Sequence, residues 1–179
     1  MRVVLYYIFG FIIYSCDALA STPSEAPKPY VTVAPGGSCF FIMSPKQVNG
    51  MPQWFDGVGI MCRAAYNGKF DILWETNGWY ERFVKISPDG KYLVRIGFSP
   101  LLGMDETTIP QLSFYDTGRL IKQYYPKDLG LAGKKGIEGY AWYIGDIIIT
   151  NDKLFLELAN HDSLEFLLED GSMHKKRVR

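Results

Sequence analysis

The sequence predicts an all-β protein built from antiparallel meanders. From Tyr30 onward, short runs of Val, Ile, Phe, Tyr and Leu alternate with Gly, Asn and Asp, and no stretch shows convincing helical periodicity. Aromatic residues make up 15% of the chain, and they favour half-buried, pleated surfaces. Turn dipeptides such as Asn67-Gly68 and Asp89-Gly90 stand between the runs. Such pairs suit tight hairpins because the central residues of these turns need positive φ angles.

The apolar runs define the expected strands. In chain order they are Tyr30 to Val33, Cys39 to Met43, Gly59 to Ala65, Phe70 to Trp74, Tyr80 to Ile86, Tyr92 to Ile96, Leu112 to Tyr115, Leu120 to Tyr124, Ile147 to Thr150, Leu154 to Leu158, Leu164 to Leu168 and Ser172 to His174. Asn67-Gly68 gives the strongest hairpin signal, that of a type I′ turn, and Thr117-Gly118 has the same character. At most one short helix is expected, near 126–130, since Pro126 suits a first helical position and Gly130 an end.

Two stretches repeat one plan. Phe83 to Tyr124 and Ile147 to Lys175 each contain four expected strands joined by turns, and Cys39 to Trp74 supplies most of a third such unit. A four-stranded antiparallel meander is the unit of a β-propeller blade. Three units are few for a closed ring, so we expect blade-like meanders packed as stacked or partly wound sheets.

The N-terminus has the features of a signal peptide. Arg2 gives a positive start, Val3 to Tyr14 are apolar apart from one glycine, and the sequence Ala18-Leu19-Ala20 fits signal-peptidase cleavage after Ala20. The apolar run is shorter than the roughly 20 residues that span a bilayer. We therefore expect a signal peptide (1–20), a Pro-rich leader (21–29), a single β domain (30–176), a basic tail (177–179), and a periplasmic or secreted location.

Two alternatives concern the cysteines. Ile13-Tyr14-Ser15-Cys16 loosely resembles a lipobox, which would attach a lipid at Cys16 instead of freeing the domain. In an oxidising compartment the remaining pair, Cys39 and Cys62, is expected to form a disulfide. The alternative is two buried free thiols that pack as small apolar side chains.

Charge and residue content exclude several function classes. Without residues 1–20, which hold one basic and one acidic side chain, the chain has 18 of each. This neutrality disfavours nucleic acid and anionic membrane surfaces as partners. The two histidines, His161 and His174, belong to no catalytic motif, and no cofactor or metal signature is present. We therefore expect no enzymatic activity, cofactor or metal site. An uncharacterised hydrolase is the remaining alternative, which a concave pocket holding a strongly perturbed carboxylate would support.

Binding is the function that the residues favour. Three connections carry apolar side chains where a plain loop would be polar, and interfaces use such side chains as anchors. The candidate partner-binding residues are Trp54 and Phe55 in Pro45 to Gly57, Leu101, Leu102 and Met104 in Phe98 to Pro110, and Tyr140, Trp142 and Tyr143 in Gly136 to Gly145.

These loops lead to two functional hypotheses. The first is an exported protein-interaction module, such as an inhibitor or immunity-type partner that plugs a cleft of another exported or periplasmic protein. The second is binding of cell-wall glycan or of a small apolar ligand by exposed Trp and Tyr. The alternative is a purely structural role, in which the apolar side chains of the loops fold back and cover the ends of the sheets. Trp74, Trp79 and Tyr80 are expected to be core residues.

A further set of motifs resembles known sequences. Gly78-Trp79-Tyr80, the run Ile86-Ser87-Pro88-Asp89-Gly90-Lys91-Tyr92-Leu93, and Phe114-Tyr115 with Gly118 resemble a group of small exported bacterial proteins of unassigned function. The resemblance covers Gly57 to Trp142, and the Ser-Pro-Asp-Gly-Lys-Tyr turn is similar to that of WD40-like propeller repeats. The chain departs from the group near Tyr140 to Tyr143, where aromatics replace a His-containing stretch. The resemblance implies no catalytic residues.

Overall fold

The protein consists of three antiparallel sheets, each formed by four consecutive strands. The computed structural model describes residues 26–97, 109–131, 143–158 and 161–177. Sheet 1 contains β1 (Tyr30–Val33), β2 (Cys39–Val48), β3 (Met51–Ala64) and β4 (Phe70–Asn77); sheet 2 contains β5 (Phe83–Ile86), β6 (Tyr92–Ile96), β7 (Leu112–Asp116) and β8 (Arg119–Tyr124); sheet 3 contains β9 (Tyr143–Ile149), β10 (Lys153–Leu158), β11 (Asp162–Leu167) and β12 (Met173–Arg177). The all-β prediction is confirmed, and none of the sheets closes into a barrel.

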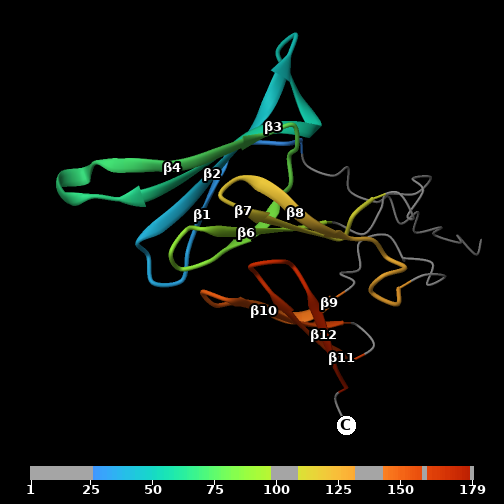
Figure 1. Ribbon diagram of the computed structural model, residues 1–179. Helices are drawn as coiled ribbons and strands as arrows, with labels where there is room; N and C mark the ends of the chain where they lie inside the picture. The colour runs from blue at the N-terminus through green and yellow to red at the C-terminus, as the bar shows by residue number, and fades with distance from the viewer. Residues whose placement is uncertain (1–25, 98–108, 132–142, 159–160, 178–179) are drawn as a thin grey trace, which may run out of the picture.

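The three sheets are stacked, with sheet 2 between the other two (Figure 1). One core lies between sheets 1 and 2, and a second lies between sheets 2 and 3. In β6, Leu93 belongs to the first core, whereas its neighbours Tyr92 and Val94 belong to the second. Burial on both faces explains why β6 is apolar at every position except Arg95.

The outer sheets show the alternation expected of strands with one covered face. In β2, Cys39, Phe41 and Met43 are buried against sheet 2, while the residues between them are half-buried. In β10, Leu154, Leu156 and Leu158 point into the second core in the same way. The period of two therefore distinguishes these outer strands from β6.

Aromatic side chains fill the core between sheets 1 and 2. The Trp79 ring stacks on Phe41 with centroids 6.2 Å apart, and it contacts Tyr115 at 5.3 Å. Trp74 Nε1 donates a hydrogen bond to the Gly90 carbonyl at 2.7 Å. Trp79 and Tyr80 are buried and Trp74 packs against the core, which confirms their prediction as core residues.

The hairpin turns differ in part from the sequence prediction. Thr117 and Gly118 both have positive φ, at 46° and 83°, and join β7 to β8 as expected. At Asn67-Gly68, however, only the glycine has positive φ, and Tyr66–Gly68 form a 3-10 turn. Ala64 pairs with Phe70, which leaves a connection too long for a two-residue type I′ turn. Residues 126–130 form a series of hydrogen-bonded turns rather than a helix.

The expected disulfide is wrong, because Cys39 and Cys62 are both buried and free. The register explains this finding: Cys39 lies opposite Arg63, and Cys62 lies opposite Phe40. Directly paired residues share a face and successive residues point to opposite faces, so the two thiols lie on opposite sides of sheet 1. The alternative of two buried free thiols is confirmed.

The chain ends also bear on the predicted boundaries. Pro27 is buried, and the Lys28 carbonyl accepts a hydrogen bond from the Tyr80 hydroxyl at 2.9 Å, so the last leader residues pack against the domain. Strand β12 continues to Arg177, into the predicted basic tail. Residues 1–20, including Cys16, lie outside the described residues, so signal cleavage and lipidation stay predictions.

Candidate functional site

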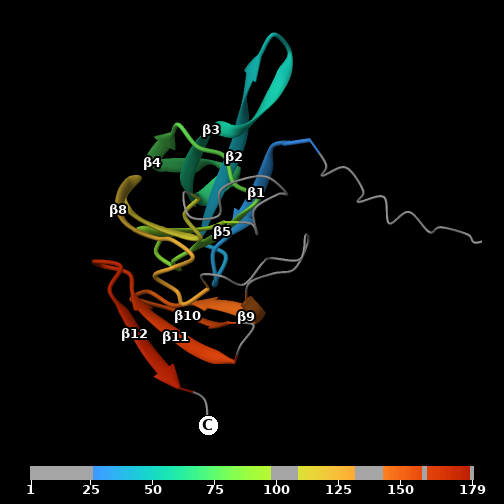
Figure 2. The same ribbon diagram turned by 90° about the vertical axis from the view of Figure 1, so that its right-hand side faces the viewer.

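The most prominent surface feature is a projecting hairpin that we call the arm, Pro45 to Gly57. It is formed by the ends of β2 and β3 and stands away from the stacked sheets (Figures 1 and 2). Sequence analysis expected a loop here, but Val48 pairs with Met51, and Asn49 and Gly50 between them have φ of 51° and 78°. The arm is therefore a strand hairpin closed by a two-residue turn of the type I′ kind.

A large bulge interrupts the arm. Pro45 pairs with Gly57 and Gln47 pairs with Pro52, so Lys46 alone faces the four residues 53–56 of the other strand. Bulges bend a strand and redirect its side chains. Trp54 and Phe55 both lie in this bulge, and both are exposed although they are consecutive.

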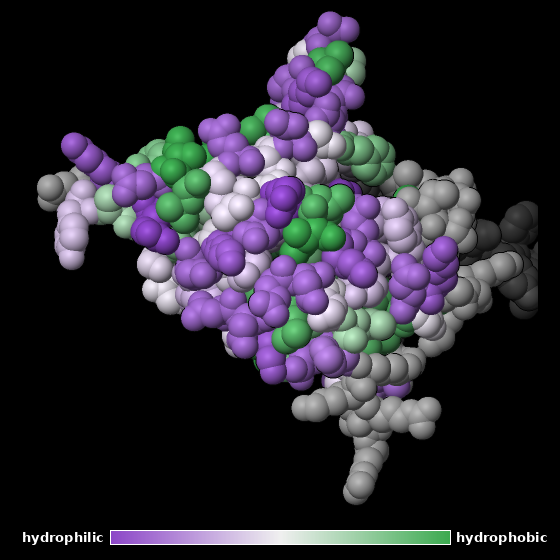
Figure 3. Space-filling model, viewed as in Figure 1, coloured by the Kyte–Doolittle hydropathy of each residue, from purple (hydrophilic) through white to green (hydrophobic). Residues whose placement is uncertain are grey.

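The arm exposes large apolar side chains. Val48, Met51, Trp54 and Phe55 have between 42% and 70% of their surface accessible. Figure 3 shows apolar surface near the tip of the arm, among polar neighbours. Because Trp, Phe and Met are enriched in the cores of protein interfaces, this composition is typical of a binding element.

Several contacts hold the arm in its conformation. Lys46 Nζ and Asp56 Oδ2 form a salt bridge of 2.9 Å across the bulge. The Arg82 guanidinium lies 5.6 Å from the centre of the Trp54 ring, a cation–π contact from outside the arm. At the base, a Cβ on Gly57 would lie 2.7 Å from the Ser44 carbonyl oxygen and 3.0 Å from that of Trp79. The glycine therefore lets the arm's base approach the Trp79 backbone closely.

The predicted partner-binding residues have different outcomes. Trp54 and Phe55 are exposed on the arm, as the prediction requires. Tyr143 begins β9, is half-buried and packs against the core between sheets 2 and 3, and burial raises the pKa of its hydroxyl. Leu101, Leu102, Met104, Tyr140 and Trp142 lie outside the described residues. Val48 and Met51, which are not among the predicted partner-binding residues, are exposed on the arm as well.

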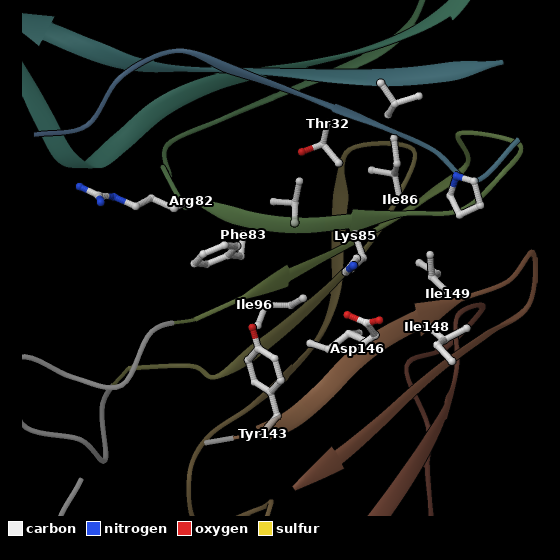
Figure 4. A pocket seen from close by; sticks show the side chains of 14 residues that line it. Thr32, Arg82, Phe83, Lys85, Ile86, Ile96, Tyr143, Asp146, Ile148 and Ile149 are labelled. Atoms are coloured by element: carbon white, nitrogen blue, oxygen red, sulfur yellow. The ribbon is translucent and has the colours of Figure 1, made fainter. Parts of the chain in front are cut away.

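A groove of about 590 Å³ runs along the first strand of each sheet. Its lining comes mainly from β1, β5 and β9, with Ile96 contributed by β6. Figure 4 shows Lys85 and Asp146 turned toward each other from β5 and β9, while the Tyr143 hydroxyl points toward Ile96. Most of the other lining residues are apolar, including Val33, Phe83 and Ile148, so the groove combines apolar walls with a few charges.

A buried polar network lies at the junction of sheets 1 and 2. Glu81 Oε2 is 3.6 Å from Arg95 Nε, and the Arg95 guanidinium is 5.5 Å from the Trp79 ring centre. Burial raises the pKa of Glu81, and the charge of Arg95 partly opposes this shift. The Tyr30 hydroxyl donates to the Glu81 carbonyl at 2.6 Å. These contacts fix the segment between β4 and β5 and leave little of Glu81 accessible, which suits a structural role.

Within the described ranges, no three His, Cys, Asp or Glu side chains are close enough together to bind a metal ion. No helix among the residues that the structure describes has the length and apolar content needed to cross a bilayer.

No model of a known protein family matches the chain, and no curated protein matches it significantly. The resemblance to small exported bacterial proteins and to propeller repeats therefore stays a prediction.

Proposed function

We propose that the chain is an exported, non-enzymatic protein-interaction module that inserts the arm into a cleft of another exported protein. An inhibitor or an immunity-type partner would act in this way. The observation that carries the proposal is the arm itself, a hairpin that projects from a three-sheet body and exposes Val48, Met51, Trp54 and Phe55.

The arm has the physical properties that make such insertion favourable. Its conformation is set before binding by the Asn49-Gly50 turn, the Lys46–Asp56 salt bridge and the Arg82–Trp54 contact. Preorganisation lowers the conformational entropy lost on association. Aromatic side chains at the centre of an interface commonly contribute 2 kcal/mol or more each to binding. Trp54 and Phe55 are therefore the expected anchors.

Capture from an extract of exported proteins tests this proposal. Immobilised protein should retain a partner that is identified by mass spectrometry, and Trp54→Ala or Phe55→Ala should weaken retention by about 30-fold or more, as for a hot-spot residue. Ile148→Ala is the matched control, because Ile148 is apolar and 58% exposed but lies on sheet 3. Retention that survives both arm substitutions, or is lost equally in the control, would contradict the proposal.

Export is tested on the same protein. The N-terminal sequence of the recovered protein should begin at Ser21 if cleavage follows Ala20. A fatty acid attached at Cys16 would instead show the lipid-anchored form, and an intact Met1 would show that export processing does not occur.

Binding of a small apolar ligand is the second candidate, and the groove along β1, β5 and β9 favours it. Its volume and largely apolar walls fall within the usual range of ligand sites. Glycan stacking receives less support from the described residues, because among them the exposed Trp54 and Tyr66 lie at the arm and at the β3–β4 turn rather than in one row. Calorimetric titration with fatty acids and with cell-wall oligosaccharides would separate these ligands from a protein partner.

A further inference from the structure

The outer face of sheet 1, which points away from sheet 2, is largely apolar, with Ser44, Glu75 and Asn77 as its polar positions. The register places on this face Val31 and Val33 of β1, Phe40 and Ile42 of β2, Val58, Ile60 and Cys62 of β3, and Phe70 and Ile72 of β4. They form cross-strand pairs such as Val31 with Ile42 and Cys62 with Ile72. The apolar surface is thus continuous across all four strands of the sheet.

Much of this face is accessible. Val31, Val33, Val58, Phe70 and Ile72 each have between 42% and 60% of their surface exposed. Figure 3 shows apolar surface at the end of the β3–β4 hairpin, which carries part of this face. Phe40 and Phe70 form an edge-to-face pair with centroids 5.8 Å apart, so the side chains are packed against one another rather than splayed.

The outer face of sheet 3 is different. There, Lys153 and Glu165 form a salt bridge of 2.9 Å, and Glu157 occupies the same face as Phe155. This charged face is typical of a sheet surface in contact with water. Among the described strands of sheet 1, outside the arm, Glu75 is the one charged residue that the register places on the outer face, and it lies on edge strand β4.

We propose that the outer face of sheet 1 is a dimer interface and that a second copy of this chain occupies it, face to face. A two-fold dimer brings the same surface from both molecules together, so an apolar face without a central charge is complementary to itself. The protein already packs sheets in this manner, since the inner face of sheet 1 lies on sheet 2 through a similar set of apolar residues. Each Glu75 would lie at the rim of the interface.

The available area is compatible with a specific dimer. The exposure of these side chains leaves on the order of 500 Å² of apolar surface on one molecule, so a face-to-face pair would bury about 1,000 Å², near the lower limit for a specific interface. An exposed apolar patch of this size on a monomer is itself a marker of an interaction site. We therefore infer a dimer whose dissociation is measurable at micromolar concentrations, distinct from the arm's interaction with a different protein.

Sedimentation equilibrium of the purified protein tests this proposal. The wild type should show a mass that rises from one to two chains with concentration, and Ile72→Lys should weaken the association by at least 100-fold, because the interface would bury an unpaired charge on each copy. Ile148→Lys is the matched control on sheet 3, with similar exposure, and should associate like the wild type. Circular dichroism confirms that each variant is folded, and Val31→Lys on edge strand β1 replaces Ile72→Lys if the latter fails to fold.

The proposal would be overturned by a wild type that stays monomeric at millimolar concentration, by lysine variants on sheet 1 that associate like the wild type, or by equal loss in the sheet 3 control. A monomeric wild type that binds another protein through this face would also overturn it. Trp54→Ala should leave the dimer intact, so failure of the dimer proposal and failure of the arm proposal are distinguishable.

Discussion

Gly59 on β3 is the position where two opposing physical effects on stability can be compared. Its φ does not lie in the left-handed region, so alanine fits the backbone there. Replacing a strand glycine by alanine in a compatible conformation normally stabilises a protein by about 0.5–1 kcal/mol, because the unfolded chain loses freedom. Backbone considerations alone therefore predict that Gly59→Ala is stabilising.

Packing predicts the opposite. A Cβ at Gly59 would overlap the ring of Phe41 and lie 2.9 Å from Thr76 Cγ2. Phe41 is fully buried between Trp74 and Trp79, with ring centroids 5.9 and 6.2 Å away, so its ring has little room to move. Overpacking of a core typically costs about 1–3 kcal/mol. This cost exceeds the backbone gain, and we expect Gly59→Ala to lower the free energy of unfolding by about 1–2 kcal/mol.

A double-mutant cycle with Phe41→Leu isolates the steric term. Leucine vacates the space that the ring occupies, so Gly59→Ala should be neutral or stabilising in the Phe41→Leu background, with a coupling energy of about 1 kcal/mol or more. Urea unfolding of the four proteins, monitored by tryptophan fluorescence, gives the required free energies. A Gly59→Ala protein that is more stable than the wild type, or a zero coupling energy, would refute the reasoning.

Three further predictions concern the thiols, a turn and a buried acid. Cys39 and Cys62 should both be alkylated after unfolding without reductant, because both are free thiols. In the native protein both should react slowly because they are buried, and burial also raises the pKa of the Cys62 thiol. A disulfide detected by mass spectrometry would contradict the register of β2 and β3. Thr117→Asn should raise the free energy of unfolding by about 0.5–1 kcal/mol, because a β-branched residue is strained at a φ of 46°. An unchanged free energy of unfolding in urea would contradict the claim that Thr117 is strained. Burial raises the pKa of Glu81 above its unfolded value, so the folded state binds the proton more tightly and this group's contribution to stability falls as pH rises between the two pKa values. The free energy of unfolding of the wild type minus that of Glu81→Gln should therefore fall as pH rises over that interval. A rise would show that the ion pair with Arg95 controls the titration.

The sequence was sufficient for the fold class because local patterns determine it. Short apolar runs separated by turn residues predicted most of the strands, and the two repeated units correspond to sheets 2 and 3. The mostly apolar strand β6, interrupted only by Arg95, and the alternation in β10 reflect burial on both faces and on one face, respectively. Three meanders, and their stacking, follow from these patterns.

Features that depend on register were not predictable in this way. Cys39 and Cys62 looked like a disulfide pair in sequence, yet their faces are set by the pairing of Cys39 with Arg63, which involves residues far apart in the chain. The apolar outer face of sheet 1 has the same origin, because no local run shows which of its residues share a face.

The arm was assigned as a loop, although one local signal was present. Pro45, Pro52 and Gly57 are unfavourable in strands and favoured a loop. The dipeptide Asn49-Gly50, flanked by Val48 and Met51, is a strong type I′ signal and identifies the hairpin in retrospect. Trp54 and Phe55 were nevertheless selected correctly as exposed candidates, since their exposure follows from the bulge rather than from strand alternation.

The assignment of partner binding to the arm is tested by comparing the wild type with a chain in which residues 46–56 are replaced by a short turn of Gly, Asn and Ser. Because the exposed side chains of the arm contribute little to the core, the armless protein should unfold within about 1 kcal/mol of the wild type and keep the same oligomeric state. Capture of the exported partner should be abolished. An armless protein that is folded and still captures that partner would contradict the assignment of binding to the arm.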